Sequence, residues 1–284
     1  MTKSPVTIVV VGSVNVDIIA RVEEFPMPGE TVTNAEVIRC PGGKGGNQAM
    51  AARRLGAKVY MLACVGDDPQ AEQSIADLLA EGVDVQSCRK LEGTATGMAL
   101  VTVSASGENQ IVVAPGANAA FKPEYLQLPP ADAVIAQLEI PMETVYKAAV
   151  SSDAFFCLNA APAKVVPRKV LDVVDLLVVN EVEAEMLGES LEGFQGLLAT
   201  TYGARGAVLT QTGIELARSK PPVINVVDTT GAGDAFTAAL TVGLASGLDQ
   251  QAALDQACVV GALTTTKSGA QTSPTLAELR QKLQ

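Results

Sequence analysis

The segment at residues 228–234, Asp-Thr-Thr-Gly-Ala-Gly-Asp, constrains the fold of this chain more than any other. It follows a β-branched run at 223–227 and precedes an apolar, Ala-rich stretch at 235–244, so we expect a strand that ends at the glycines and continues as a helix. The first N–H groups of a helix lack intrahelical partners, and with the helix dipole they attract anions such as phosphate. Asp234 is placed as a general base would be for a hydroxyl that attacks phosphorus, although a helix cap is the simpler alternative.

The rest of the chain alternates between short apolar runs and amphipathic stretches. The apolar runs predict buried strands at residues 6–11, 59–65, 134–138, 155–158, 176–179 and 207–209. Amphipathic helices that stop at Gly56 and Gly82 fit between some of these strands. The alternation predicts a three-layer α/β/α fold in which helices cover both faces of a mostly parallel sheet.

Polar residues follow several of the predicted strands. They are Asp67, Glu139, Asn159 and Asn180. Each one alone is more often a turn former or a helix cap. Because ligands of open α/β sheets bind beyond the carboxyl ends of the strands, we expect these residues and the glycine loop to line one crevice.

Two β-rich segments interrupt the α/β pattern, at residues 31–39 and 98–113. The second is broken by a predicted hairpin turn at 106–109. Residues 98–103 carry apolar side chains on both alternating faces. A small flap built from them would expose one hydrophobic face unless something covers it.

The composition excludes several classes of function. A net charge of −11 and a pI near 4.6 argue against a nucleic-acid partner or an anionic membrane surface. The chain has no histidine, which removes Ser-His-Asp, Cys-His and histidine-ligated zinc chemistry. Five cysteines without a C-x-x-C pair are typical of reduced thiols in a cytoplasmic protein. The apolar runs are too short for a signal peptide or a membrane span, so we expect a soluble protein.

A second glycine cluster, Pro-Gly-Gly-Lys-Gly-Gly-Asn-Gln-Ala at residues 41–49, resembles the first signature of the PfkB sugar-kinase family. Residues 228–234 resemble the second signature. Further motifs stand in the family's order at 12–17, 28–31, 66–68, 137–139, 180–183 and 267–271. The resemblance covers essentially the whole chain. It implies a single kinase domain over residues 1–284, with lid strands inserted at about 14–40 and 95–114.

The resemblance implies ATP-dependent phosphorylation of a sugar, and Lys44 after the double glycine is typical of members that act on ribose at its 5-hydroxyl. Asp234 is then the general base. The amides of Gly231, Ala232 and Gly233 stabilise the charge that develops on the γ-phosphate. The expected sugar-binding residues are Asp17, Asn15, Gly43, Lys44, Asn47 and Glu139.

The resemblance also implies sites for the nucleotide and for two cations. Asn180 and Glu183 match a motif that organises Mg²⁺ and phosphate through water, or they form an ordinary capping box. Thr201 and Gly203 match a nucleotide-phosphate loop. A K⁺ site is implied at Asp228, although a turn cap at Thr230 is the alternative. Its other oxygens would come from the carbonyls of Thr230, Thr264, Lys267 and Gly269 and from the Ser273 hydroxyl.

Two further features follow from the comparison with the family pattern. The family lid pairs with the lid of a second subunit, so a homodimer is expected. Between Glu183 and Thr200 the chain is shorter than is usual in the family, with room for little helix or strand. We therefore expect a thinner edge on the nucleotide half.

Competing functions remain at this stage. A Rossmann oxidoreductase is disfavoured because Gly12 is followed by Ser-Val-Asn, and a P-loop is disfavoured because Lys44 is followed by Gly45. A silent sugar-binding protein would keep the sugar contacts but lose the base or the anion loop. A kinase for another sugar or a nucleoside stays open, since the motifs define the reaction better than the substrate.

Overall fold

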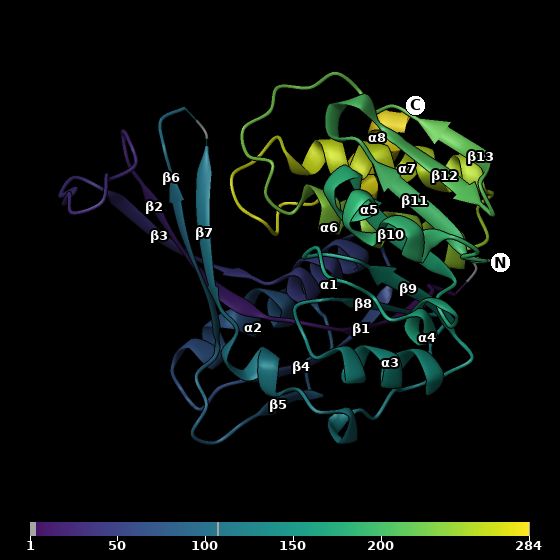
Figure 1. Ribbon diagram of the computed structural model, residues 1–284, viewed down its shortest axis with the longest axis horizontal. Coiled ribbons are helices and arrows are strands. Elements are labelled where there is room, and N and C mark those ends of the chain that lie inside the picture. Colours follow the sequence, from purple (N-terminus) through teal and green to yellow (C-terminus); the bar gives the residue numbers. More distant parts are fainter. Residues whose placement is uncertain (1–3, 107, 284) are drawn as a thin grey trace.

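The computed structural model describes residues 4–106 and 108–283, and this part of the chain contains one large and one small sheet (Figure 1). The large sheet has nine strands in the order β13-β12-β11-β10-β9-β8-β1-β4-β5 within these residues. Neighbouring strands from β5 to β11 are parallel, and β12 and β13 are antiparallel. The strands are β1 (Thr7–Val11), β4 (Lys58–Val65), β5 (Cys88–Lys90), β8 (Ala133–Gln137), β9 (Phe155–Asn159), β10 (Leu176–Asn180), β11 (Leu197–Thr201), β12 (Ala207–Gln211) and β13 (Ile214–Ser219).

Helices cover both faces of the large sheet, so the predicted three-layer α/β/α fold is confirmed. One face packs on α1 (Lys44–Arg54), α2 (Gln70–Glu81), α6 (Ala232–Ala245), α7 (Gln250–Thr264) and α8 (Leu276–Leu283). The other face packs on α3 (Met142–Val150), α4 (Arg168–Leu171) and α5 (Glu181–Leu187). Short 3₁₀ turns lie at η1 (Gly116–Ala120), η2 (Pro123–Tyr125), η3 (Gly188–Leu191) and η4 (Gly203–Arg205).

Alternation along the buried strands builds the two cores. In β1, Ile8 and Val10 face the core under α1 and α6, whereas Val9 and Val11 face the core under α3. All four side chains are fully buried. A continuous apolar run is therefore the sequence pattern of a strand with both faces covered.

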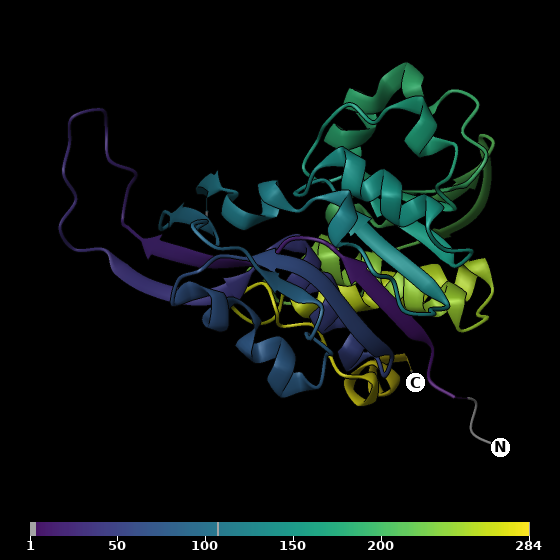
Figure 2. The ribbon, with the colours of Figure 1, turned by 90° about the horizontal axis from the view of Figure 1, so that it is seen from below.

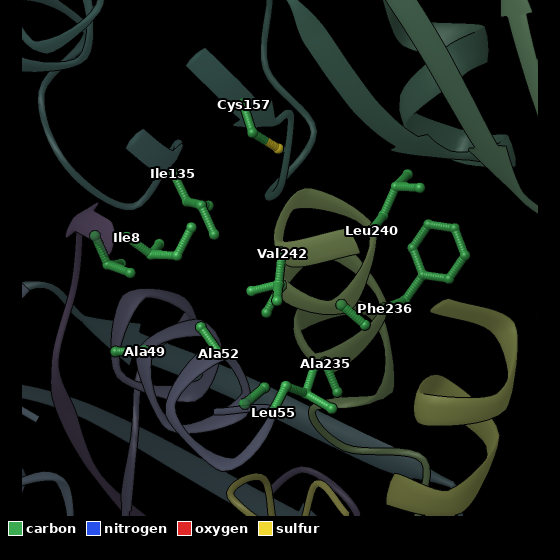
Figure 3. Packing of buried hydrophobic residues seen from close by; sticks show 14 of the residues in the cluster. Ile8, Ala49, Ala52, Leu55, Ile135, Cys157, Ala235, Phe236, Leu240 and Val242 are labelled. Atoms are coloured by element: carbon green, nitrogen blue, oxygen red, sulfur yellow. The ribbon is translucent and has the colours of Figure 1, made fainter. Parts of the chain in front are cut away.

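Helices α1 and α6 pack side by side on one face of the sheet. Figure 3 shows Ala52 of α1 on the side toward Ala235 of α6, with Ile8 and Ile135 of the strands above the two helices. Small side chains allow two helices to approach closely. The close packing brings the N-terminal turns of α1 and α6, and hence the two glycine clusters, to the same place.

Each of these two helices begins at a glycine that the backbone requires. Gly43 and Gly231 precede α1 and α6 with φ values of 84° and 77°. A methyl group at Gly231 would lie 2.2 Å from the carbonyl oxygen of Ala270. Both the left-handed conformation and the close approach therefore exclude a side chain at this position.

The small sheet has four strands within the described residues, in the order β3-β2-β6-β7, and it projects from the main body (Figures 1 and 2). The strands are β2 (Asn15–Arg21), β3 (Glu36–Gly42), β6 (Gly97–Val103) and β7 (Asn109–Ala114). The predicted β-rich segments are thus present, although the first begins as a strand only at Glu36. The predicted turn at 106–109 includes Gly107, which lies outside the described residues.

The strand predicted at residues 223–227 is wrong. This segment is an irregular connection between β13 and α6, and Val223 is completely exposed. Pro221 and Pro222 directly precede it, and proline cannot donate to a sheet ladder. The β-branched composition alone therefore did not make a strand.

The region between Glu183 and Thr200 holds more regular structure than the sequence led us to expect. It contains most of α5, the η3 turn and most of β11. Strand β11 pairs with β10 on one side and with β12 on the other, and β13 forms the edge. The sheet therefore continues past this short region.

Candidate active site

Asp234 lies in the first turn of α6 and is held by two amides from α1. Asn47 Nδ2 donates to Asp234 Oδ2 over 2.9 Å, and Gln48 Nε2 donates to Asp234 Oδ1 over 3.1 Å. The Asp234 side chain is buried. Burial raises the pKa of Asp234 above its usual value, while Lys44 and the two amides oppose this rise. The glycine clusters at residues 41–49 and 228–234 thus meet at one carboxyl group.

The residues that precede Asp234 form the helix N-terminus. Gly231 caps α6 and Ala232 is its first residue, so their N–H groups belong to the turn that lacks intrahelical acceptors. Ala232 and Gly233 line a cleft beside Asp234. A methyl group at Gly233 would meet no heavy atom within 4 Å in the described structure, so the backbone here is open to a ligand.

Glu139 follows β8 and reaches the start of α1. Its Oε2 accepts from Ser13 Oγ over 2.5 Å and from the backbone N–H of Lys44 over 3.1 Å. Gly43 lets the start of α1 lie against the connection between β1 and β2, because a side chain there would collide with the backbone of Val14 and Asn15. Glu139 therefore ties the ends of β1 and β8 to the N-terminus of α1.

Asp17 lies on β2 at the mouth of the same crevice. Burial, followed by the charges of Glu139 and Asp234, raises the pKa of Asp17 to about 7. Among the described residues, Asp17 Oδ1 and Asn47 Oδ1 are buried without a hydrogen-bond partner. Buried polar atoms are normally paired, so these two oxygens indicate a place where ligand hydroxyls would bind.

Lys44 brings positive charge to this group of carboxylates. Asp234 is the largest influence on Lys44 and, together with Glu139 and Glu183, raises its pKa despite burial. The ammonium therefore stays protonated beside the acidic residues. Lys44 was expected among the sugar-binding residues, and its closeness to Asp234 was not foreseen.

Asn15 is buried at the start of β2 and is held by a residue that the sequence analysis missed. Asn118 Nδ2 donates to Asn15 Oδ1 over 2.8 Å and to Val14 O over 3.1 Å. Asn118 Oδ1 accepts from the N–H of Val14 over 3.1 Å. Asn118 thus fixes the β2 end that carries Asn15.

A cleft with a volume of about 440 Å³ opens next to the N-terminus of α6. Thr201 and Gly203 line it together with Ala232 and Gly233, so the predicted nucleotide-phosphate loop and the anion loop meet. Its apolar part includes Pro222, Ile224, Phe236, Cys258 and Ala262. An elongated ligand with an anionic end and a flat apolar end would fit this cleft.

Asn180 and Glu183 form the capping box that the sequence analysis kept as an alternative. The N–H of Asn180 donates to Glu183 Oε2 over 2.8 Å, and the N–H of Glu183 donates to Asn180 Oδ1 over 2.9 Å. Burial raises the pKa of Glu183, with Lys44 opposing and Asp234 reinforcing the rise. The cap therefore lies at the edge of the same charged crevice.

The residues of the implied K⁺ site gather from two loops. Asp228 accepts from the N–H groups of Thr230 and Gly269, each over 2.9 Å. Burial disfavours the Asp228 carboxylate, but these hydrogen bonds hold the pKa of Asp228 below its usual value. Thr272 Oγ1 lies 2.9 Å from Thr264 O and 3.0 Å from Gly269 O, so its one hydroxyl hydrogen is shared between these two carbonyls.

The remaining residues of that site differ in what they contribute. Ser273 is buried, and its hydroxyl has no hydrogen-bond partner in residues 4–106 and 108–283. The Lys267 ammonium forms an exposed ion pair with Glu278 over 3.3 Å, so only the Lys267 carbonyl can take part. Within the same residues, no group of three or more His, Cys, Asp or Glu side chains is arranged to hold a metal. The oxygens at this place are those of backbone carbonyls and of the Ser273 hydroxyl, beside the Asp228 carboxylate.

Two glutamines were also missed. Gln48 and Gln137 are fully buried, and Gln137 Nε2 donates to Gln48 Oε1 over 2.6 Å. Gln48 Nε2 also donates to Asn159 Oδ1 over 3.2 Å. For Gln137 the available signal was a polar residue at the end of a buried strand, the signal that had identified Asn159. Gln48 lies on α1 and carries no such signal.

In the part of the chain that the structure describes, no helix is long and apolar enough to cross a membrane.

Comparisons with known proteins agree with this geometry. A family model described as pfkB family carbohydrate kinase matches residues 6–276. The ribokinase of Bacillus subtilis (strain 168) is 38% identical over 291 residues, which cover 97% of this chain and 99% of that protein.

Solved structures of similar proteins share the fold. A ribokinase structure from Thermotoga maritima has a TM-score of 0.90 and 29% identity, and the match covers 98% of this chain and 99% of that one. A structure of Arabidopsis thaliana ribokinase complexed with ribose and ATP has a TM-score of 0.88 and 27% identity, with 99% of both chains covered. The large mostly parallel sheet and its helices are therefore those of known sugar kinases.

Proposed function

This chain belongs to the pfkB family of carbohydrate kinases, and we propose that it acts as an ATP-dependent ribokinase that transfers the γ-phosphoryl group of ATP to the 5-hydroxyl of D-ribose. The observation that carries the proposal is the position of Asp234. This buried carboxyl group lies in the anion-binding turn of α6, between the cleft lined by Thr201 and Gly203 and the unpaired oxygens of Asp17 and Asn47.

Asp234 is the general base in this proposal. It accepts the proton of the 5-hydroxyl while that oxygen attacks the γ-phosphorus and the bond to the β-phosphate oxygen breaks, so that ADP leaves. The N-terminal amides of α6 at Gly231, Ala232 and Gly233 stabilise the charge on the transferred group. The positive charge of Lys44 opposes the rise in the pKa of Asp234 that burial causes, and so favours the carboxylate form.

The sugar lies over the N-terminus of α1. Asp17 and Asn47 supply the buried oxygens that accept from its hydroxyls, and Glu139, Gly43 and Asn15 complete the wall. Carboxylates suit vicinal hydroxyls because they only accept hydrogen bonds. A kinase for another sugar or for a nucleoside remains the alternative, and a silent sugar-binding protein is disfavoured because the base and the anion loop are both present.

ATP occupies the 440 Å³ cleft with its base among the apolar residues near Phe236. Asn180 and Glu183 would hold Mg²⁺ through water, where the ion neutralises phosphate charge. The donor set fits, because the capping box uses one carboxylate oxygen of Glu183 and leaves the other for a water ligand. The phosphates then meet Thr201 and Gly203.

A K⁺ ion in the loops beside α6 is also part of the proposal. The buried, unpaired Ser273 hydroxyl and the converging carbonyls of Thr264 and Gly269 fit such an ion, with Asp228 supplying the charge. The carbonyls of Thr230 and Lys267 would complete the cage. Ordering of these loops would fix Gly231 and its amide, because Gly231 packs against Ala270.

In this proposal residues 1–284 form a single kinase domain. Its lid pairs with the lid of a second copy of the chain. The face of the small sheet that carries Asp17 points to the crevice. The opposite face carries Val37, Leu100 and Val112, of which Leu100 and Val112 are directly paired. All three are more than 40% exposed in the single chain. A partner lid would cover this apolar face.

We place the enzyme in the cytoplasm, supported by its free cysteines.

The proposal is tested by ATP-dependent turnover. ADP release is measured with D-ribose, other pentoses, hexoses and nucleosides at equal concentration. Ribose is expected to give the highest kcat/KM. If a hexose or nucleoside exceeds it tenfold, the substrate assignment is wrong, and if none of them is phosphorylated, the kinase assignment is wrong as well.

A further inference from the structure

A chain of buried carboxamides leads from the strand ends of the large sheet to Asp234. Gln137 at the end of β8 donates from Nε2 to Gln48 Oε1 over 2.6 Å. Gln48 on α1 donates from Nε2 to Asp234 Oδ1 over 3.1 Å and to Asn159 Oδ1 over 3.2 Å. Gln48 and Gln137 are both 0% exposed, so water does not replace these bonds.

The orientation of each amide follows from its neighbours. Asn159 Nδ2 donates to Val178 O over 3.3 Å, which turns Asn159 Oδ1 toward Gln48. Gln48 Nε2 therefore faces two acceptors, Asn159 and Asp234. A reversed Gln48 would place its oxygen against an amide oxygen and a carboxylate. Its Oε1 thus faces away from Asp234 and requires a donor, which Gln137 supplies.

Gly12 makes room for the first member of this chain. A methyl group at Gly12 would lie 2.0 Å from Gln137 Oε1 and 2.8 Å from its amide carbon. Any side chain at position 12 would displace the Gln137 amide. The glycine that opens the motif at residues 12–17 therefore acts on the carboxamide chain.

We propose that Gln48 is a positioning residue that keeps Asp234 ionised and aimed at the attacking hydroxyl, and that Gln137, seated on Gly12, fixes the direction of Gln48. The proposal rests on the role of Asp234 as general base. The charged groups that face Asp234 are Lys44 from α1, Glu139 from the end of β8, Asp17 from β2 and Glu183 from α5.

These charges do not aim the carboxylate, because none of them is hydrogen-bonded to it. Only Asn47 and Gln48 among the described residues donate to its two oxygens, one to each. Loss of Gln48 would leave Oδ1 buried without a donor. That loss disfavours the carboxylate form and frees the side chain to rotate.

The test replaces Gln48 by an apolar side chain of similar length, Gln48→Met. We expect kcat to fall about 10- to 100-fold, with the KM for ribose and for ATP within threefold of wild type. The acid limb of the kcat–pH profile should move up by about one to two units. Gln256→Met is the matched control. Gln256 on α7 donates from Nε2 to Ala239 O over 3.1 Å, and Ala239 lies on α6, the helix that carries Asp234, but Gln256 makes no hydrogen bond to Asp234. Its kcat–pH profile should match wild type.

Gln137→Met tests the chain independently and replaces Gln48→Met if that variant fails to fold. Gln137→Met should move the acid limb of the kcat–pH profile up by less than Gln48→Met does. The double variant Gln48→Met/Gln137→Met should lose no more kcat than Gln48→Met alone. Full additivity of the two losses would show that Gln137 does not act through Gln48 and would overturn the proposal.

A measurement without substrates separates this proposal from the proposed function. The pKa of the Asp234 carboxyl is followed by ¹³C NMR in aspartate-labelled protein and assigned by its absence in Asp234→Asn. A raised pKa in Gln48→Met and an unchanged one in Gln256→Met are expected. An unchanged pKa in Gln48→Met overturns the positioning role, whereas failure of the wild type to phosphorylate ribose overturns only the proposed function.

Discussion

Asn47 Nδ2 donates to Asp234 Oδ2 over 2.9 Å, although the two residues are separated by 187 positions. Asn47 lies in the glycine cluster at residues 41–49 and Asp234 ends the glycine cluster at residues 228–234, so one hydrogen bond joins the two signature motifs. Small residues along α1 and α6 permit this meeting by letting the helices pack closely. The sugar-binding and phosphate-binding halves of the site are therefore fixed to each other by the core.

The affinity for ribose should depend on pH through Asp17, whose pKa is raised to about 7. The carboxylate accepts hydrogen bonds from sugar hydroxyls, whereas the protonated acid loses an acceptor position. The Kd for ribose, measured by calorimetry without ATP, should rise as the pH falls from 8 to 6. Asp17→Ala should weaken binding by about 1.5 to 3 kcal/mol per lost hydrogen bond and abolish the pH dependence. A wild-type Kd that stays constant from pH 6 to 8 would contradict the role of Asp17.

The same raised pKa predicts a pH-dependent stability. Between about pH 4 and 7 the folded protein holds a proton on Asp17 that the unfolded chain releases, so the stability contributed by this group falls as the pH rises through that window. Asp17→Asn should therefore unfold at a higher denaturant concentration than wild type at pH 8. The difference should shrink toward pH 4. Equal midpoints at pH 8 would show that the Asp17 carboxyl is not desolvated in the free protein.

Gly231→Ala should destabilise the protein by roughly 1 to 3 kcal/mol, because φ is 77° and the added methyl group would meet Ala270 O at 2.2 Å. Gly233→Ala is the matched variant two residues along, inside α6 with open space at Cβ. It should leave stability unchanged or increase it by about 0.5 to 1 kcal/mol, since alanine favours a helix. Urea unfolding measures both. Equal effects of the two substitutions would contradict the described α6 cap.

Potassium should activate the enzyme more than sodium. The unpaired Ser273 hydroxyl and the Thr264 and Gly269 carbonyls suit a large, weakly hydrated ion, and Asp228 holds the adjoining loop. Initial rates at constant ionic strength in potassium, sodium and tetramethylammonium salts test this. Asp228→Ala should remove the potassium-specific increase. Equal rates in all three salts would exclude the site.

A negative charge on the outer face of the lid should prevent dimer formation. Val112 lies opposite Leu100 on the face that points away from Asp17, and it is 66% exposed in the single chain. We expect wild type to sediment as a dimer and Val112→Glu as a monomer. Ile214→Glu, which charges an equally exposed position on the far edge strand β13, should remain dimeric. A monomeric wild type would rule out pairing through the lid.

The positions of the buried strands along the chain were predictable from sequence, because strands covered on both faces are continuously apolar. This holds for β1, β4, β8, β9 and β10. Strands β11 and β13 were missed because they lie toward the antiparallel end of the sheet, where polar residues are tolerated. Residues 223–227 were wrongly predicted as a strand for the complementary reason, since their β-branched side chains have no neighbouring strand to pair with.

The candidate site was predictable where a local motif carries it. Asp234, Asn47 and Asp17 each stand in such a motif, and the structure brings them into one crevice. The links made by Gln48 and Gln137 depend on how α1 lies against the end of β8, which no local pattern encodes. The role of Gly12 likewise becomes apparent only from the position of the Gln137 amide.

Asp234 is the base for phosphoryl transfer in this account. The most direct test measures both the kcat of Asp234→Asn and its affinity for ribose. The substitution keeps the shape of the side chain but removes its ability to accept the proton. We predict that kcat falls by about 10² to 10⁴, while the Kd for ribose, measured by calorimetry, stays within threefold of wild type. A purified Asp234→Asn variant that folds, binds ribose and retains wild-type kcat would contradict the account.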